Sequence, residues 1–247
     1  MKKELFAQYP KPIIFAHRGY SSRAPENTML AFDLCKEHNI VGIELDVHMC
    51  KSGELVIIHD HHLGRLCNLD AVVEELRWEQ LKRLDVGSFK GAEFTGATIP
   101  LLSELFEKHH THFIYDIELK TMDAKDGQLA LKVWQCIQTY HLQEHVLISS
   151  FNPFVIRQFN RLSGNTIPTG TIYSLSKEVP PLLRRGWGRY IARPSVLKPH
   201  WELVNPKRVS RYPIITWTVD DPKQAKALAQ MNVAGIISND PLKLLGI

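Results

Sequence analysis

The sequence lacks several features that would assign it to a specialised class of protein. Its four cysteines, Cys35, Cys50, Cys67 and Cys136, include no CxxC pair, which argues against a zinc ribbon, a redox pair or a disulfide framework. No apolar run approaches the roughly 18 residues of a membrane span. The N-terminal MKKELFAQYPKP has no unbroken apolar region of the kind a secretory signal needs. We therefore expect a cytoplasmic protein without stable membrane association.

A strong charge of either sign is also absent. The net charge is +4 over 247 residues, and the basic residues near position 190 are spread, which fits a solvated helix face better than a nucleic-acid interface. We expect no nucleic-acid partner, although positive charge helps to attract an anionic substrate. The chain has no GxGxxG, GxxxxGK[ST], HExxH or GxSxG. Dinucleotide, nucleoside triphosphate, zinc-protease and serine-hydrolase functions therefore lack their main sequence support.

The chain does contain a regular alternation of short apolar runs with amphipathic segments, which is typical of βαβ units and a parallel sheet. Several expected helices begin with proline in a polar turn, as in APENT, FNPF, DDPK and NDPL. A length of 247 residues matches one barrel. We predict a (β/α)8 TIM barrel whose eight strands lie at 13–16, 42–48, 113–119, 146–150, 169–173, 190–194, 213–219 and 234–238.

The alternation breaks between His59 and Pro100, where one helix-like stretch at 74–84 stands among loop-like sequence. The apolar run 55–59 is counted as an extension and not as a barrel strand. We expect a small insertion at about residues 60–100 near the barrel mouth. No linker divides the chain, so residues 1–247 are expected to form one domain, as a monomer or homodimer.

Polar residues gather where the expected strands end, which is where barrels of this kind carry their function. In GIELDVH the two-residue period of a strand places on one face Glu44, Asp46 and His48. In YDIELK the same period aligns Asp116, Glu118 and Lys120. Carboxylates converging inside a barrel repel each other, and a divalent cation relieves that repulsion. Oxygen-only ligands favour Mg²⁺ or Ca²⁺, with Mn²⁺ a further candidate, over zinc. The alternative is a buried salt-bridge network with Lys120 or Arg18.

Two histidines end separate apolar runs, His17 after IIFA and His59 after LVII. General acid–base catalysis needs one group to take a proton and another to give one, and two histidines can divide that work. Arg18 offers the bidentate fork that suits a phosphate. These residues also have structural alternatives. His17 could be a histidine with a purely structural role in the core, and Arg18 could form an ion pair with Asp46. The run His59–His62 suggests a soft-metal site, but neighbouring strand residues point to opposite faces.

The ordered motifs AHRG, APENT, IELDV, SGELVIIHD, LDVGSF, IPLLSEL, IELK, SSF and WTV run from residue 14 to about residue 240. In this order they resemble the glycerophosphodiester phosphodiesterase family over nearly the whole chain. The resemblance implies a (β/α)8 barrel with a small subdomain inserted after the HD motif. It also implies an enzyme of lipid and glycerol metabolism that hydrolyses glycerophosphodiesters to an alcohol and sn-glycerol 3-phosphate.

The resemblance implies a role for each matching residue. The metal ligands would be Glu44, Asp46 and Glu118. The acid and base would be His17 and His59. The phosphate contacts would be Arg18 and Lys120. The loop after the first strand would be braced by Glu26 and Asn27. The substrate pocket would be lined by Phe151 and Trp217, unless these two simply pack in the core.

The chain departs from the family pattern in two places. An RTTNG run often follows the HD motif, whereas residues 65–69 read RLCNL, and WTV is commonly followed by Asn where this chain has Asp220. Both changes are expected on the head-group side of the substrate, so they affect specificity more than catalysis. Two alternatives stay open. One is a phospholipase of the same superfamily, either lysophospholipase D-like or a cyclising phosphotransferase, and the other is a non-catalytic phosphodiester sensor.

Overall fold

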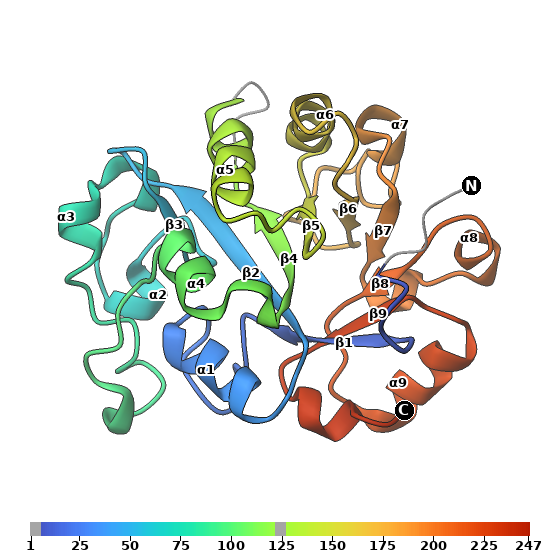
Figure 1. Ribbon diagram of the computed structural model, residues 1–247, viewed down its shortest axis with the longest axis horizontal. Coiled ribbons are helices and arrows are strands. Elements are labelled where there is room, and N and C mark those ends of the chain that lie inside the picture. The colour runs from blue at the N-terminus through green and yellow to red at the C-terminus, as the bar shows by residue number, and fades with distance from the viewer. Residues whose placement is uncertain (1–5, 122–126) are drawn as a thin grey trace.

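The computed structural model describes residues 6–121 and 127–247. Its centre is a barrel of parallel strands (Figure 1): β1 (Ile13–His17), β2 (Gly42–Met49), β4 (Ile114–Leu119), β5 (Val146–Ser150), β6 (Thr169–Tyr173), β7 (Val196–Pro199), β8 (Ile215–Thr216) and β9 (Gly235–Ser238). The strands are ordered β7-β6-β5-β4-β2-β1-β9-β8. Parallel bridges from Leu197 to Ile214 and from His200 to Trp217 join the two ends. The predicted (β/α)8 barrel is confirmed.

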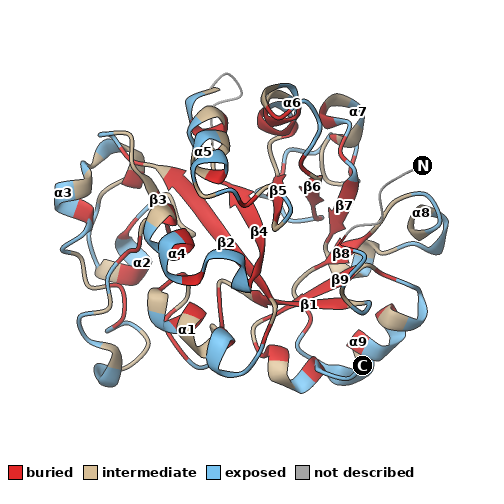
Figure 2. Cartoon of the chain, in the orientation of Figure 1, coloured by how far each residue is buried: buried red, intermediate tan, exposed pale blue. Residues whose placement is uncertain are grey.

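Helices surround the barrel, with buried inner faces and exposed outer faces (Figure 2). Their caps follow the sequence: the side chains of Thr28, Asn152 and Asp221 accept hydrogen bonds from backbone N–H groups of the first turn. The helices outside the insertion are α1 (Met29–Glu37), α4 (Leu102–His109), α5 (Gly127–Thr139), α6 (Pro153–Leu162), α7 (Arg189–Ala192), α8 (Pro206–Val209) and α9 (Pro222–Gln230), with 3-10 turns η3 (His110–His112), η4 (Trp201–Leu203) and η5 (Pro241–Leu244).

The barrel interior has an apolar floor beneath a polar layer. Alternate residues of each strand point inward, so that Ile13 and Phe15 of β1 lie below His17. The floor is one buried cluster of Phe6, Ile13, Phe15, Ile114, Leu147, Val196, Ile215 and Ile237. Polar side chains therefore lie only at the carboxyl end of these inward rows, where charged groups can reach the mouth.

The insertion between β2 and α4 contains β3 (Leu55–Ile57), α2 (Gly64–Cys67), η1 (Val73–Glu75), α3 (Trp78–Leu81) and η2 (Ala92–Phe94). β3 pairs antiparallel with β2 outside the barrel order, as expected of an extension. The single helix expected at 74–84 is wrong. Leu76 is extended between η1 and α3, and its carbonyl accepts a hydrogen bond from the Lys51 amide. This contact to the turn after β2 divides the stretch into two short elements.

The strand expected at 190–194 is also wrong. These residues fall largely in α7, which ends at Arg193 in the left-handed conformation with φ of 51°, and the strand follows at Val196–Pro199. The Ala192 carbonyl accepts a hydrogen bond from Asn160 of α6, which holds the short helix against its neighbour. The strand expected at 213–219 is reduced to β8.

Candidate active site

Three carboxylates meet at the carboxyl ends of β2 and β4. The register places Glu44 beside Asp116 and Asp46 beside Glu118, so inward residues of the two strands become neighbours. Carboxylate oxygens of Glu44, Asp46 and Glu118 lie within 4.8 Å of one another, and all three side chains are buried. The shared parity expected from the sequence thus brings these acids into one cluster.

The electrostatics of this cluster call for added positive charge. Burial, and then the neighbouring Asp46 carboxylate, raise the pKa of Glu44 well above its ordinary value. Although burial opposes it, the Lys120 ammonium and other positive groups hold the pKa of Asp46 well below its ordinary value. Asp46 Oδ1 is buried and makes no hydrogen bond to any described residue. An orphaned oxygen in an all-oxygen donor set fits a hard divalent cation.

Lys120 lies against the same acids. Its Nζ is 3.0 Å from Glu118 Oε1 and 3.4 Å from Asp46 Oδ1. Although burial opposes it, Glu118 and Asp46 raise the pKa of Lys120 above its ordinary value. Lys120 is therefore a fixed positive charge at the edge of the cluster. Its two ion pairs form part of the buried salt-bridge network that the sequence analysis kept as an alternative to a metal site.

His17 ends β1 directly beside Glu44 in the register. Its Nδ1 donates to Asn239 Oδ1 at 2.7 Å, and its Nε2 lies 4.0 Å from Glu44 Oε2. Because a neutral imidazole carries one proton, this bond leaves Nε2 as an acceptor directed at the acidic cluster. Burial, and then the charge of Arg18, lower the pKa of His17 to about 4. His17 is thus held as a neutral base.

His59 approaches from the insertion side, just beyond β3. Its Nδ1 lies 2.6 Å from Asp60 Oδ1, so it is paired with a carboxylate where His17 is paired with an amide. Arg65 donates from Nε to Asp60 Oδ2 at 2.6 Å and makes two further hydrogen bonds to Glu26. The two histidines therefore differ in the charge of their partners.

The loop after β1 contains Glu26 and Asn27, for which the family resemblance implies a bracing role. Arg18 has φ of 57° and Asn27 has φ of 56°, and the Asn27 amide donates to the Arg18 carbonyl. Asn27 Nδ2 donates to Asp46 Oδ2 at 2.8 Å, and Arg18 Nη1 donates to Glu26 Oε1 at 2.7 Å. Arg18 Nε is 3.5 Å from Asp46 Oδ2 and makes no hydrogen bond among the described residues. Glu26 and Asn27 thus position Arg18 and Asp46.

These side chains open into one cavity of about 990 Å³. Phe151 and Trp217 line it and contact each other edge to face, with ring centroids 5.7 Å apart. Trp217 Nε1 donates to the Lys198 carbonyl, and His200 packs on the other edge of Trp217. The cavity therefore has the acidic cluster on its β1–β4 side, whereas its β5–β8 side carries the aromatic pair together with Lys198 of β7. All predicted site residues border it except Glu26 and Asn27, which lie behind Arg18.

Two polar groups at the site were missed from sequence. Lys198 of β7 is 1% exposed, and its Nζ lies 2.7 Å from Asp116 Oδ2 and 2.9 Å from Ser149 Oγ. Lys198 was missed because the strand was expected at 190–194, whereas β7 starts at Val196. Asn239, the partner of His17, follows β9 and lies 222 residues further along the chain. The NDPL turn was noted only as a helix start, so no sequence signal tied it to the site.

The two departures from the family pattern have different positions. The changed residues of the RLCNL run are Leu66, Cys67 and Leu69, and none of them borders the cavity. Leu66 and Cys67 pack in the apolar cluster of the insertion, whereas Arg65, which the two runs share, lines the cavity next to His59. Asp220 instead contacts Ser238 and Asn239: its Oδ1 accepts from Ser238 Oγ at 2.8 Å, and its Oδ2 accepts from Asn239 Nδ2 at 2.8 Å. Asp220 therefore lies behind His17 and not among the residues that border the cavity.

A (β/α)8 barrel with an acidic cluster, two histidines and basic side chains at its carboxyl end has the composition of a phosphoric diester hydrolase. The comparisons with known proteins give the particular family. Residues 17–243 match the model of the glycerophosphoryl diester phosphodiesterase family. The chain belongs to this family and is a phosphoric diester hydrolase.

Relatives match over nearly their whole length. A glycerophosphodiester phosphodiesterase of Caldanaerobacter subterraneus subsp. tengcongensis is 32% identical over 96% of this chain and 98% of its own. One from Bacillus altitudinis is 33% identical over 92% and 94%. The solved structure of an Oleispira antarctica phosphodiesterase in complex with its product sn-glycerol-3-phosphate has a TM-score of 0.83 and 28% identity, covering 94% of this chain and 95% of that one. Among the described residues, no helix is long and apolar enough to cross a membrane.

Proposed function

We propose that this chain hydrolyses glycerophosphodiesters to an alcohol and sn-glycerol 3-phosphate in a reaction that depends on a divalent cation. The observation that supports it most strongly is the cluster of Glu44, Asp46 and Glu118 in a cavity that His17 and His59 also line. The product bound in the Oleispira antarctica relative supports the same substrate class. One chain supplies every proposed role, within a single domain at 1–247 that has an insertion at about 60–100.

Glu44, Asp46 and Glu118 would hold the cation, and their all-oxygen donor set favours Mg²⁺, Ca²⁺ or Mn²⁺. When bound, the cation would supply positive charge that offsets the negative charge of the phosphodiester and of its transition state. Lys120 and Arg18 add fixed positive charge at the same place. Lys120 contacts Glu118 and Asp46, and Arg18 contacts Asp46 and Glu26. The side chains of Lys120 and Arg18 are thus positioned before substrate binds.

His17 and His59 divide the proton transfers. His17 donates from Nδ1 to Asn239 Oδ1, which would leave Nε2 free to take a proton from the attacking water or from the glycerol 2-hydroxyl. His59 Nδ1 lies 2.6 Å from Asp60 Oδ1, and this ring would give a proton to the leaving alcohol. The two rings thus have different partners, an amide for His17 and a carboxylate for His59.

The aromatic side of the cavity would receive the organic part of the substrate. Phe151 and Trp217 meet edge to face and present apolar surface opposite the charged cluster. Arg65, which the RLCNL run shares with the usual RTTNG run, lies near His59 and Asp60. The choice of head group is therefore expected to depend on Phe151, Trp217 and Arg65.

The decisive assay measures release of sn-glycerol 3-phosphate from glycerophosphodiesters and, in parallel, release of lysophosphatidic acid from lysophospholipids. The enzyme is first treated with EDTA and then supplied with Mg²⁺, Ca²⁺ or Mn²⁺ in turn. Activity should return only with a cation and should be lost in Glu44→Gln, while Glu79→Gln on the exposed surface serves as the matched control. Activity unaffected by EDTA would contradict the metal dependence. Turnover of lysophospholipids alone, or binding without turnover, would contradict the substrate class. A cyclic phosphate seen by ³¹P NMR would identify the 2-hydroxyl as nucleophile.

A further inference from the structure

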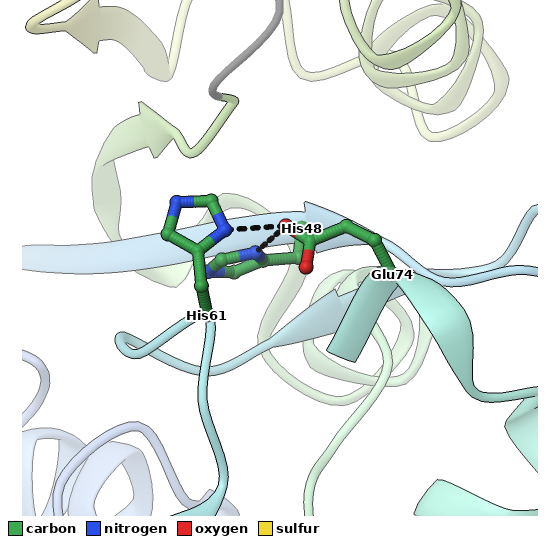
Figure 3. A group of neighbouring side chains, drawn as sticks. All are labelled: His48, His61 and Glu74. Atoms are coloured by element: carbon green, nitrogen blue, oxygen red, sulfur yellow. Dashed lines mark hydrogen bonds and ion pairs between the residues drawn. The ribbon is translucent and has the colours of Figure 1, made fainter. Parts of the chain in front are cut away.

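A second group of potential ligands lies where the insertion meets the end of β2, at the rim of the cavity just described, which His61 lines and which His48 and Glu74 do not. Ring nitrogens of His48 and His61 and a carboxylate oxygen of Glu74 lie within 4.8 Å of one another. Figure 3 shows both rings directed at the same carboxylate, with each residue coming from a different segment. His48 is the penultimate residue of β2, His61 follows β3, and Glu74 belongs to η1. This convergence differs from the HDHH run, because only one histidine of that run takes part.

The hydrogen bonds place both rings on one oxygen atom. Glu74 Oε1 lies 2.7 Å from His48 Nδ1 and 2.6 Å from His61 Nδ1. The ring centroids of the two histidines are 4.6 Å apart. Glu74 Oε2 is buried and has no hydrogen-bond partner among the described residues. Although burial opposes it, hydrogen bonds from His48 and His61 hold the pKa of Glu74 well below its ordinary value, so the group is a carboxylate.

The contact made by Nε2 of His48 determines which ring nitrogen carries the proton in the neutral side chain. His48 Nε2 lies 3.2 Å from the His59 carbonyl oxygen, which can only accept, so Nε2 must carry a proton. In the neutral ring Nδ1 is then a bare lone pair facing a carboxylate oxygen at 2.7 Å. That contact is attractive only with a positive species between the two atoms. Either a second proton on His48 or a metal ion fills this role.

We propose that His48, His61 and Glu74 form a second cation site of the zinc type, separate from the acidic cluster of Glu44, Asp46 and Glu118. Two imidazole nitrogens and one carboxylate oxygen are a donor set that suits Zn²⁺, whereas the acidic cluster suits harder ions. A metal-bound histidine usually donates its other N–H to a backbone carbonyl, as His48 does to His59. One ion would replace the two Nδ1 protons that face Glu74 Oε1, the proton of His61 moving to its Nε2 and that of His48 being released, and would bind all three donors together.

The site is accessible from solvent, and the Glu74 side chain can move enough to admit an ion. His48 is fully buried, but the side chains of His61 and Glu74 are 26% and 34% exposed, so an ion and a water ligand can enter from their side. Donors around a tetrahedral Zn²⁺ lie about 3.3 Å apart. The Nδ1–Oε1 distances would therefore have to lengthen by about 0.6 Å, and the partly exposed Glu74 side chain can withdraw that far. The bound ion would tie η1 to β2 and to the segment that carries His59.

The test counts Zn²⁺ bound per chain after exhaustive dialysis, with apo-protein prepared by chelation. In Glu44→Gln/Glu118→Gln, which removes ligands of the acidic cluster, one Zn²⁺ per chain should remain. Adding His61→Asn or Glu74→Gln should abolish it, whereas His62→Asn, an exposed neighbour in the same run, should not. In the parent chain, which can also take zinc in the acidic cluster, the same substitutions should lower the count from two to one.

Two further measurements distinguish a zinc site from an ion pair between protonated His48 and Glu74. A saturating Zn²⁺ concentration of 100 times Kd should raise the Tm of the chain by about 5–10 °C, and by much less in Glu74→Gln. Co²⁺ bound there should give the strong visible absorption of a four-coordinate site. Zinc binding that is equal in Glu74→Gln, His61→Asn and the parent would overturn the proposal. Absence of zinc from the Glu44→Gln/Glu118→Gln chain and from the parent would also overturn it and leave a protonated His48–Glu74 pair.

Discussion

Replacing Lys198 by Met should be among the most destabilising single changes in the barrel. Its Nζ lies 2.7 Å from Asp116 Oδ2, and Lys198 and Asp116 are 1% and 0% exposed. Ser149 Oγ bridges the pair, accepting from Lys198 and donating to Asp116. Removing one partner leaves a buried charge uncompensated, which costs about 3–5 kcal/mol. For a chain of this size that corresponds to a fall in Tm of roughly 6–20 °C.

Urea and thermal unfolding of the parent and variants measure this cost. Lys108→Met is the matched control, because Lys108 makes a 2.7 Å ion pair with Asp33 but is 49% exposed, and should change stability by less than ~1 kcal/mol. The double variant Lys198→Met/Asp116→Leu removes both charges and should recover most of the loss, since a buried pair replaced by apolar groups is often neutral. If the single and double variants are equally unstable, packing and not charge explains the effect and the reasoning is refuted.

The remaining predictions concern the catalytic residues and the cysteines. His17→Ala and His59→Ala should each lower kcat by ~10²-fold or more; near-parent turnover in both would contradict their assignment. Asn239→Leu should lower kcat by roughly 10-fold with little change in KM, measured by steady-state kinetics, because the His17 ring loses the partner that fixes its tautomer. Burial raises the pKa of the Cys35 thiol to about 12, so iodoacetamide at pH 8 should alkylate it ~10³-fold more slowly than an ordinary thiol; rapid labelling of the native protein, followed by mass spectrometry, would show that Cys35 is accessible.

The sequence predicted the parts of the site that depend on strand periodicity. Glu44 and Asp46 share the parity of one strand and Glu118 that of its neighbour, and the parallel register brings them together. Lys198 escaped prediction because strand-like residues at 190–194 form a helix, fixed by a tertiary contact from Asn160. Local pattern could not reveal such contacts.

Asp220, which stands where the family commonly has Asn, supports the residue that contacts His17. Its carboxylate accepts three hydrogen bonds, from Ser238 Oγ at 2.8 Å, from the Asn239 amide at 2.7 Å and from Asn239 Nδ2 at 2.8 Å. The last bond fixes the orientation of the Asn239 carboxamide, so that its Oδ1 faces His17 and accepts from Nδ1. The side chain of an asparagine at position 220 would offer only one acceptor oxygen. The aspartate therefore holds the partner of His17 more firmly than the usual residue could, and its effect is expected on proton transfer and not on head-group choice.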